Sequence, residues 1–119
     1  DPNVVKVVTD ARARALYFSR APIPWMRDGA PSGLAKPSRH AGAHRPLELY
    51  AYRVAALTRL TAMPPSALET IERLEQLRAL ESGLTVCVAD ALVVPGPDVN
   101  TPADVPAVEA LLAGDSYRL

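Results

Sequence analysis

Glu75 and Gln76, an acid followed by an amide, lie in the segment "SALETIERLEQLR", whose apolar spacing predicts a helix. At about 100° per residue, Glu75 falls between Leu68 and Ile71 at the edge of the buried stripe of that helix. A carboxylate in this position needs a partner, because burying it unsatisfied is costly. Two interpretations stay open: an ion pair with an arginine of a neighbouring element, or an acceptor and donor pair that lines a polar pocket.

Three further places carry groups that could bind a ligand. Arg20 ends the run "YFSR" and so places a cation at a predicted strand end, where α/β sheets collect ligands; a structural salt bridge is the alternative. Tyr50 and Tyr52 share one face of another predicted strand, and packing or an interface is the alternative for them. His40 and His44 have a spacing that binds metal on a helix. Because the residues between them predict no helix, we expect exposed or hydrogen-bonded loop histidines.

The elements that must position these groups alternate between β-rich and helical patterns. Residues 4–8 and 16–18 predict two strands of a hairpin or bend, and a long proline-rich loop follows them. Period-two alternation predicts a half-buried strand in "LELYAYRV", and the continuous β-branched run "LTVCVAD" predicts a buried strand. Helices are predicted over residues 54–63, 66–82 and 102–112. The order favours an α/β fold with a mixed sheet.

Two of these helices have explicit start signals. Ser66 can cap the second helix, and Glu69 stands three residues later, where a capping box places its acid. In "PGPDVNTPADV", Thr101 can cap the last helix, Pro102 fits its first position and Asp104 completes a second box. The sequence therefore predicts both helix starts to within a residue.

Composition excludes several classes of function. The chain has 119 residues, so it is one small domain or part of a larger one. Thirteen basic residues balance thirteen acidic ones, so no general field attracts nucleic acid or an anionic membrane. No apolar run or leader pattern points to a membrane or export, and a cytoplasmic location is the default expectation. Cys87 is the single cysteine, which excludes an internal disulfide, and its apolar setting predicts a core residue.

The sequence resembles a known family over nearly its whole length. The motifs "DPNVVKVVTDARARALYFSRAPIPW", "LYAYR", "SALETIERLEQLR" and "PGPDVNTPADV" follow one another as in the carboxy-terminal half of CMP-KDO synthetases, the 3-deoxy-manno-octulosonate cytidylyltransferases. The resemblance implies a nucleotide-diphospho-sugar transferase-like fold. It also implies transfer of CMP from CTP to a sugar acid, with Mg²⁺ as cofactor and release of pyrophosphate.

That resemblance also assigns roles along the chain. It makes residues 1–119 the acceptor-binding and dimerisation half of the domain, with the amino-terminal nucleotide-binding half absent, so we expect this chain alone to be inactive. The substrate-binding residues that it implies are Arg20, Tyr50, Glu75 and Gln76. Asn100 matches an aspartate that helps to hold Mg²⁺ in the family, and Asp98 is an alternative ligand. CTP, a small acidic acceptor and a second copy of the chain are the implied partners.

Departures from the family pattern keep three hypotheses open. Pro46 and Thr70 replace family histidines, Glu48 replaces a glycine, and Asn100 replaces the aspartate. The leading hypothesis is a cytidylyltransferase with a KDO-type acceptor, as used in lipopolysaccharide biosynthesis. A second keeps the chemistry and takes phosphonoformate as the acceptor in a phosphonate pathway. The third is a non-catalytic homologue or dimerisation module.

Overall fold

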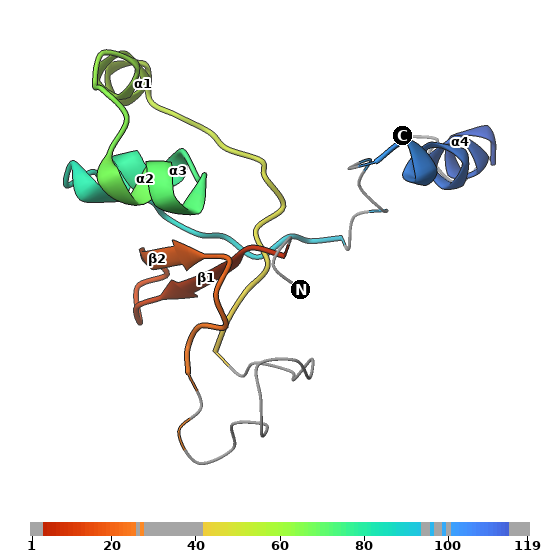
Figure 1. The fold of residues 1–119 in the computed structure, drawn as a ribbon, viewed down its shortest axis with the longest axis horizontal. Helices are drawn as coiled ribbons and strands as arrows, with labels where there is room; N and C mark the ends of the chain where they lie inside the picture. Colours follow the sequence, from red (N-terminus) through yellow and green to blue (C-terminus); the bar gives the residue numbers. More distant parts are fainter. Residues whose placement is uncertain are drawn as a thin grey trace. The chain divides into compact units, whose positions relative to one another are not determined.

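A computed structural model describes residues 4–25, 27, 42–93, 96, 99 and 101–114. The chain divides into two units, Asp1–Ala89 and Asp90–Leu119, which are described separately below. Within the described residues, the first unit contains a hairpin and three helices, and the second contains a short helical segment towards its carboxyl end (Figure 1). Among the described residues, no helix has the length and apolarity that crossing a bilayer requires.

The predicted hairpin is confirmed. Strand β1, Lys6–Thr9, pairs in antiparallel fashion with β2, Ala15–Ser19, and Val7 lies opposite Phe18. Asp10 shapes the connection, because its Oδ1 accepts from the backbone amides of Arg12 and Arg14 at 2.8 and 2.9 Å. A short acidic side chain that bonds to the backbone a few residues on is a common way to stabilise a turn.

Two segments border the hairpin, each through a single antiparallel bridge. Val7 and His44 exchange backbone hydrogen bonds of 2.9 Å on one side. On the other side, Arg14 faces Cys87, and Val88 donates to the Ala13 carbonyl at 2.8 Å. The described sheet is therefore a two-stranded hairpin with short extensions.

Both of the other predicted strands were wrong as regular elements. In the segment 47–53, Glu48 has a positive φ of 58°, which interrupts the extended backbone, and Leu49 is 87% exposed. In the segment 84–90 only the bridge at Cys87 forms, and Val86 and Val88 pack on the core. Cys87 points to the other face and is exposed, which corrects the expectation of a core cysteine.

Helix α1, Val54–Thr61, matches its prediction, whereas the single helix expected over 66–82 is two helices. Helix α2, Ala67–Glu72, begins at the predicted capping box of Ser66 and Glu69. It ends at Arg73, whose φ of 54° is left-handed, and α3, Gln76–Glu81, follows. The break has a packing cause. A continuous helix would place Leu77 about half a turn away from Leu68, yet both pack on the same core.

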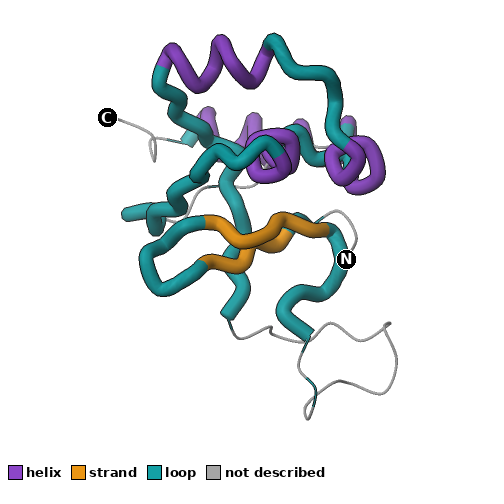
Figure 2. Tube along the Cα trace, turned by 90° about the vertical axis from the view of Figure 1, so that its left-hand side faces the viewer, coloured by secondary structure: helices purple, strands orange, loops and turns teal. Residues whose placement is uncertain are grey.

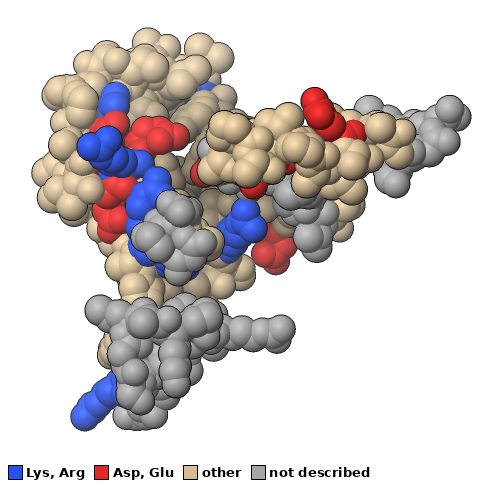
Figure 3. Space-filling model, turned by 45° about the vertical axis from the view of Figure 1, so that its right-hand side comes forward, with Lys and Arg blue, Asp and Glu red and all other residues tan. Residues whose placement is uncertain are grey.

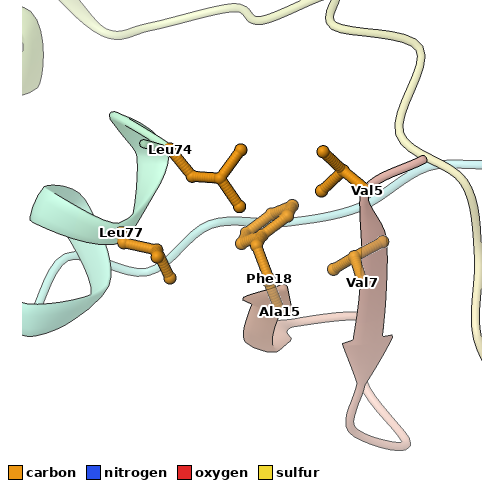
Figure 4. Packing of buried hydrophobic residues seen from close by; sticks show 6 residues of the cluster. All are labelled: Val5, Val7, Ala15, Phe18, Leu74 and Leu77. Atoms are coloured by element: carbon orange, nitrogen blue, oxygen red, sulfur yellow. The ribbon is translucent and has the colours of Figure 1, made fainter. Parts of the chain in front are cut away.

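The core lies between the hairpin and the α2–α3 layer. Phe18 stands between Leu74 and Leu77 on the helical side and Val5 and Val7 on the β1 side (Figure 4). Figures 1 and 2 show the helices of this unit gathered on one side of the hairpin. Arg78 joins the helices to one another: its Nε donates to Glu69 at 2.7 Å, and its Nη1 donates to the Met63 carbonyl at 3.2 Å.

The second unit confirms the predicted helix start at Thr101. The backbone amide and hydroxyl of Thr101 donate to Asp104 Oδ2 at 2.7 and 2.9 Å. A turn of 3₁₀ helix, η1, covers Pro102–Asp104, and α4 covers Val105–Ala113. The predicted metal ligands Asp98 and Asn100, just before this cap, lie outside the described residues.

Candidate functional site

A hollow of about 230 Å³ opens in the first unit where three segments meet. The end of β2, the irregular segment after His44 and the break between α2 and α3 each contribute to its wall. Its lining is mostly polar and consists of Arg20, Glu48, Tyr50, Arg73, Leu74, Glu75 and Gln76. On the face shown in Figure 3, basic and acidic side chains lie next to one another rather than in separate patches.

The hollow brings together the four residues predicted to bind substrate. Arg20 arrives from the strand end and Tyr50 from the irregular segment, while Glu75 and Gln76 open α3. Glu75 is exposed and borders the hollow, whereas Gln76 is only 5% exposed. Of the two interpretations of Glu75, the geometry fits a residue that lines a pocket. Substrate binding by these four residues stays a prediction.

Glu72 is a residue of this region that sequence reasoning missed. Its Oε1 accepts from the Ser19 hydroxyl at 2.5 Å and from Tyr17 at 3.3 Å, and its Oε2 accepts from the Arg20 amide at 3.0 Å. Burial raises the pKa of the Glu72 carboxyl, but these hydrogen bonds outweigh burial and hold the pKa below its usual value. A signal was available, because Glu72 follows Leu68 by four residues and so lies on the same helix face.

An ion pair with an arginine of a neighbouring helix was one interpretation of Glu75. In the structure, Glu69 forms such a pair, with Arg78. Its carboxylate accepts from Arg78 Nε at 2.7 Å and from the backbone amide of Ser66 at 3.0 Å. The hydrogen bond from Arg78 lowers the pKa of the Glu69 carboxyl, and the Ser66 amide adds to the effect. Neither Glu69 nor Arg78 lines the hollow, so this pair serves the fold.

Tyr50 contributes a phenol that stays protonated at neutral pH. Burial raises the pKa of Tyr50 to about 12, and the negative charges of Glu75 and Glu48 act in the same direction, as does Tyr52. The rings of Tyr50 and Tyr52 lie 6.3 Å apart between centroids, which agrees with the shared face that alternation predicted. The protonated hydroxyl can donate a hydrogen bond to an acidic ligand.

Two lining residues have a left-handed backbone that side chains seldom adopt. Glu48 has a φ of 58° and Arg73 a φ of 54°. Such conformations cost energy for residues other than glycine and gather at functional sites. They bring one acid and one base to the wall, which also holds Glu75 and Arg20. The formal charges of the hollow therefore balance.

The described residues contain no group of three or more histidine, cysteine, aspartate or glutamate side chains that could hold a metal. His44 borders the hairpin through its backbone bridge to Val7, in keeping with a loop hydrogen-bonding residue. Its predicted companion His40 lies outside the described residues.

Comparison with known proteins identifies the family. A family model described as cytidylyltransferase matches residues 1–86, well over half of the chain. This chain belongs to the cytidylyltransferase family. The match covers β1, β2, the helices α1, α2 and α3, and every residue that lines the hollow.

Among its relatives, this cytidylyltransferase chain is 50% identical to the 3-deoxy-manno-octulosonate cytidylyltransferase of Methylibium petroleiphilum, over 94% of the chain and 43% of the relative. It is 52% identical to the enzyme of the same name from Thioalkalivibrio sulfidiphilus, over 94% of the chain and 44% of the relative. The chain thus spans less than half the length of these relatives. The resemblance to CMP-KDO synthetases is confirmed.

The fold of this cytidylyltransferase chain is similar to that of a solved structure. The chain is similar to CMP:2-keto-3-deoxy-manno-octonic acid synthetase complexed with CTP, with a TM-score of 0.79 and 37% identity. The similarity covers 95% of this chain and 43% of that structure. The predicted α/β class, as part of such a fold, is confirmed.

Proposed function

We propose that the protein transfers CMP from CTP to a 3-deoxy-manno-octulosonate-type acid and releases pyrophosphate. The hollow at the end of β2 would hold the acid. The observation that carries the proposal is that Arg20, Tyr50 and the pair Glu75 and Gln76, from three segments far apart in sequence, line one small hollow. The chain's relatives bear the name of this transferase, and a similar solved structure is a complex with CTP.

The size and charge of the hollow suit the acceptor better than the nucleotide. Its volume of about 230 Å³ lies below the roughly 300 to 1,000 Å³ of ordinary ligand pockets. Two arginines and two glutamates line the hollow, together with a phenol and an amide. A ligand with one carboxylate and many hydroxyls matches these groups, because each hydroxyl can both donate and accept a hydrogen bond.

Phosphonoformate is less well supported as the acceptor. It is small and more strongly anionic than a sugar acid, so a pocket for it should carry an excess of positive charge. Glu48, which replaces the family glycine, adds a negative charge to the wall instead.

The four residues predicted to bind substrate are each assigned a role in binding the acceptor. We assign the acceptor carboxylate to Arg20, whose guanidinium can bind it through two hydrogen bonds. Glu75 and Gln76 would accept from and donate to the hydroxyls, and Tyr50 would donate its phenolic proton. Held in this way, the acceptor oxygen attacks the α-phosphorus of CTP and pyrophosphate leaves. Positioning of the reactants supplies much of the catalysis in such a transfer.

Mg²⁺ is the cofactor that this reaction implies. Asn100, or Asp98 in its place, would hold it, since an amide oxygen and a carboxylate are both ligands that Mg²⁺ accepts. When bound, the ion neutralises charge on the triphosphate.

We also propose a homodimer in the cytoplasm. Several apolar side chains of the segment 47–53 and of α1 are exposed, namely Leu47, Leu49, Tyr52, Val54 and Leu57. Exposed apolar surface marks interfaces when it is contiguous, and we propose that these side chains form such a surface. Light scattering on the purified protein should give twice the mass of one chain, and Leu49→Glu with Leu57→Glu should shift that mass to one chain.

The activity is tested by following pyrophosphate release from the full-length protein with CTP, Mg²⁺ and an acceptor. We expect release with 3-deoxy-manno-octulosonate and none with phosphonoformate. Release with phosphonoformate alone would favour the second hypothesis. No release with either acceptor would defeat both enzymatic hypotheses and favour a non-catalytic homologue.

A further inference from the structure

We propose that Glu72 is a positioning residue that fixes Arg20 at the wall of the hollow. The inference deepens the function proposed above and rests on it, because Arg20 is the residue to which we assign the acceptor carboxylate. Glu72 does not line the hollow, so it acts through Arg20.

The carboxylate of Glu72 holds the backbone at the end of β2. It accepts from the Arg20 amide at 3.0 Å and from the hydroxyl of the preceding residue, Ser19, at 2.5 Å. Ser19 is 1% exposed, and its Oγ in turn accepts from the Ala21 amide at 2.9 Å. Residues 19–21 are therefore tied to one side chain of α2.

The backbone carbonyl of Glu72 holds the side chain of Arg20. Arg20 Nε donates to it at 3.1 Å. Carbonyls in the last turn of a helix lack an intrahelical partner, and α2 ends at the left-handed residue Arg73. The helix break thus offers the Glu72 carbonyl to Arg20, and the same break brings Glu75 and Gln76 to the hollow.

Lys6 completes the set of contacts from the β1 side. Its Nζ donates to the Arg20 carbonyl at 2.5 Å and to the Val4 carbonyl at 2.6 Å. The amide, carbonyl and Nε of Arg20 are then each bound by a named group of the protein. A residue whose backbone and side chain are both held keeps its geometry without a ligand, which is the condition for preorganised binding.

Glu69 provides a matched control on the same helix. Its carboxylate is also hydrogen-bonded by an arginine and a backbone amide, but those partners are Arg78 and Ser66. Loss of either carboxylate should weaken the fold. Only loss of the Glu72 carboxylate should release the backbone amide of Arg20 at the end of β2.

The first test reads the order of Arg20 directly and needs no acceptor. In the full-length protein, the signal of the Arg20 backbone amide, which donates to Glu72 Oε2, is recorded by nitrogen-15 NMR for the wild type, Glu72→Gln and Glu69→Gln. We expect a sharp, slowly exchanging signal in the wild type and Glu69→Gln, and faster exchange in Glu72→Gln. An equally slow signal in all three proteins would overturn the inference.

The second test measures KM for 3-deoxy-manno-octulosonate and for CTP. In Glu72→Gln we expect the acceptor KM to rise about tenfold, equivalent to about 1.4 kcal/mol, with the CTP KM unchanged. Glu69→Gln should leave both unchanged at a similarly lowered melting temperature. Equal rises in both variants would show that Glu72 has a structural role only.

The two tests separate this inference from the proposed function. If Glu72→Gln loosens Arg20 but the wild type shows no transferase activity, the positioning role is supported and the proposed function is defeated. Transferase activity with an unaltered acceptor KM in Glu72→Gln would do the reverse. If Glu72→Gln does not fold, Ser19→Ala removes the shortest bond to the same carboxylate, and we expect the same changes at smaller size.

Discussion

At the scale of single residues, the hollow depends on groups whose protonation is set by their neighbours. Tyr50 is the clearest case, because burial and the charges of Glu75 and Glu48 favour its neutral phenol. Glu72 shows the opposite balance, since hydrogen bonds from Ser19 and Arg20 favour its charged form despite burial. At neutral pH the hollow thus has a hydrogen-bond donor in Tyr50, and Arg20 at its wall is bound by the anion Glu72.

The titration of Tyr50 gives a prediction with a definite sign. Its pKa is raised from 10.0 to about 12 in the folded protein, so its contribution to stability is complete below pH 10. That contribution is lost as the pH rises from 10 towards 12. The carbon-13 shift of the Tyr50 ring should show a midpoint near 12, and Tyr50→Phe should lessen the alkaline loss of stability. A midpoint at 10 would refute this description of its surroundings.

Substitution of Glu75 tests whether this residue binds the acceptor or forms a structural ion pair. Because it is exposed at the rim, Glu75→Gln should change the free energy of unfolding by less than about 0.5 kcal/mol. Affinity for 3-deoxy-manno-octulosonate should fall about tenfold, the effect of about 1.4 kcal/mol. Glu109→Gln, the same change at an exposed position of α4, is the control for both measurements. A drop in melting temperature with unchanged acceptor affinity would point to a structural role.

At the scale of elements, the α2–α3 break makes the site. The residues that line the hollow include all four from Arg73 to Gln76. Without the break, Glu75 and Gln76 would continue the helix, and the Glu72 carbonyl would be engaged within it.

The left-handed residue at the break can be tested by substitution. Arg73→Gly should keep the break and leave the free energy of unfolding equal or up to about 1 kcal/mol higher, since glycine adopts positive φ freely. Arg73→Val should lower it by about 1 to 2 kcal/mol, because a β-branched residue resists that conformation. Thermal unfolding of the two variants measures the difference. Equal stabilities would argue for a continuous helix in solution.

The sequence predicted elements wherever local signals decide them. The hairpin, α1 and both capping boxes are of this kind, because turn residues and caps act within a few positions. The break at Arg73 carries no glycine or proline, and only the need for Leu68, Leu74 and Leu77 to pack on one core requires it. The alternation around Tyr50 is likewise real, yet Glu48 turns the backbone out of a strand.

The candidate site was predictable in composition but not in assembly. The residues themselves pointed to Glu75 and Gln76 beside an apolar stripe, to Arg20 at a strand end and to Tyr50 on a strand face. The family resemblance then implied that all four bind substrate. Glu72 lies on the same helix face as Leu68, but its role was not predicted, because its partners lie at the end of β2, more than fifty positions earlier. Such partners become visible only when the chain is folded.

At the scale of the whole molecule, the first unit is held by a small core on which the hollow depends. Phe18 is 2% exposed and contacts both layers (Figure 4). Phe18→Ala should lower the free energy of unfolding by about 3 to 5 kcal/mol, through lost burial and the cavity that remains. Chemical denaturation measures this loss, and Leu16→Ala, at a 61% exposed position of β2, is the control. Similar losses in the two variants would contradict the described core.

The central claim is that the hollow between the end of β2 and the α2–α3 break binds the acceptor acid. The most direct measurement is an NMR search for intermolecular contacts between carbon-13-labelled 3-deoxy-manno-octulosonate and the full-length protein. We expect contacts from the ligand to the Tyr50 ring and to the Gln76 side-chain amide. Contacts confined to residues outside the hollow would contradict the claim.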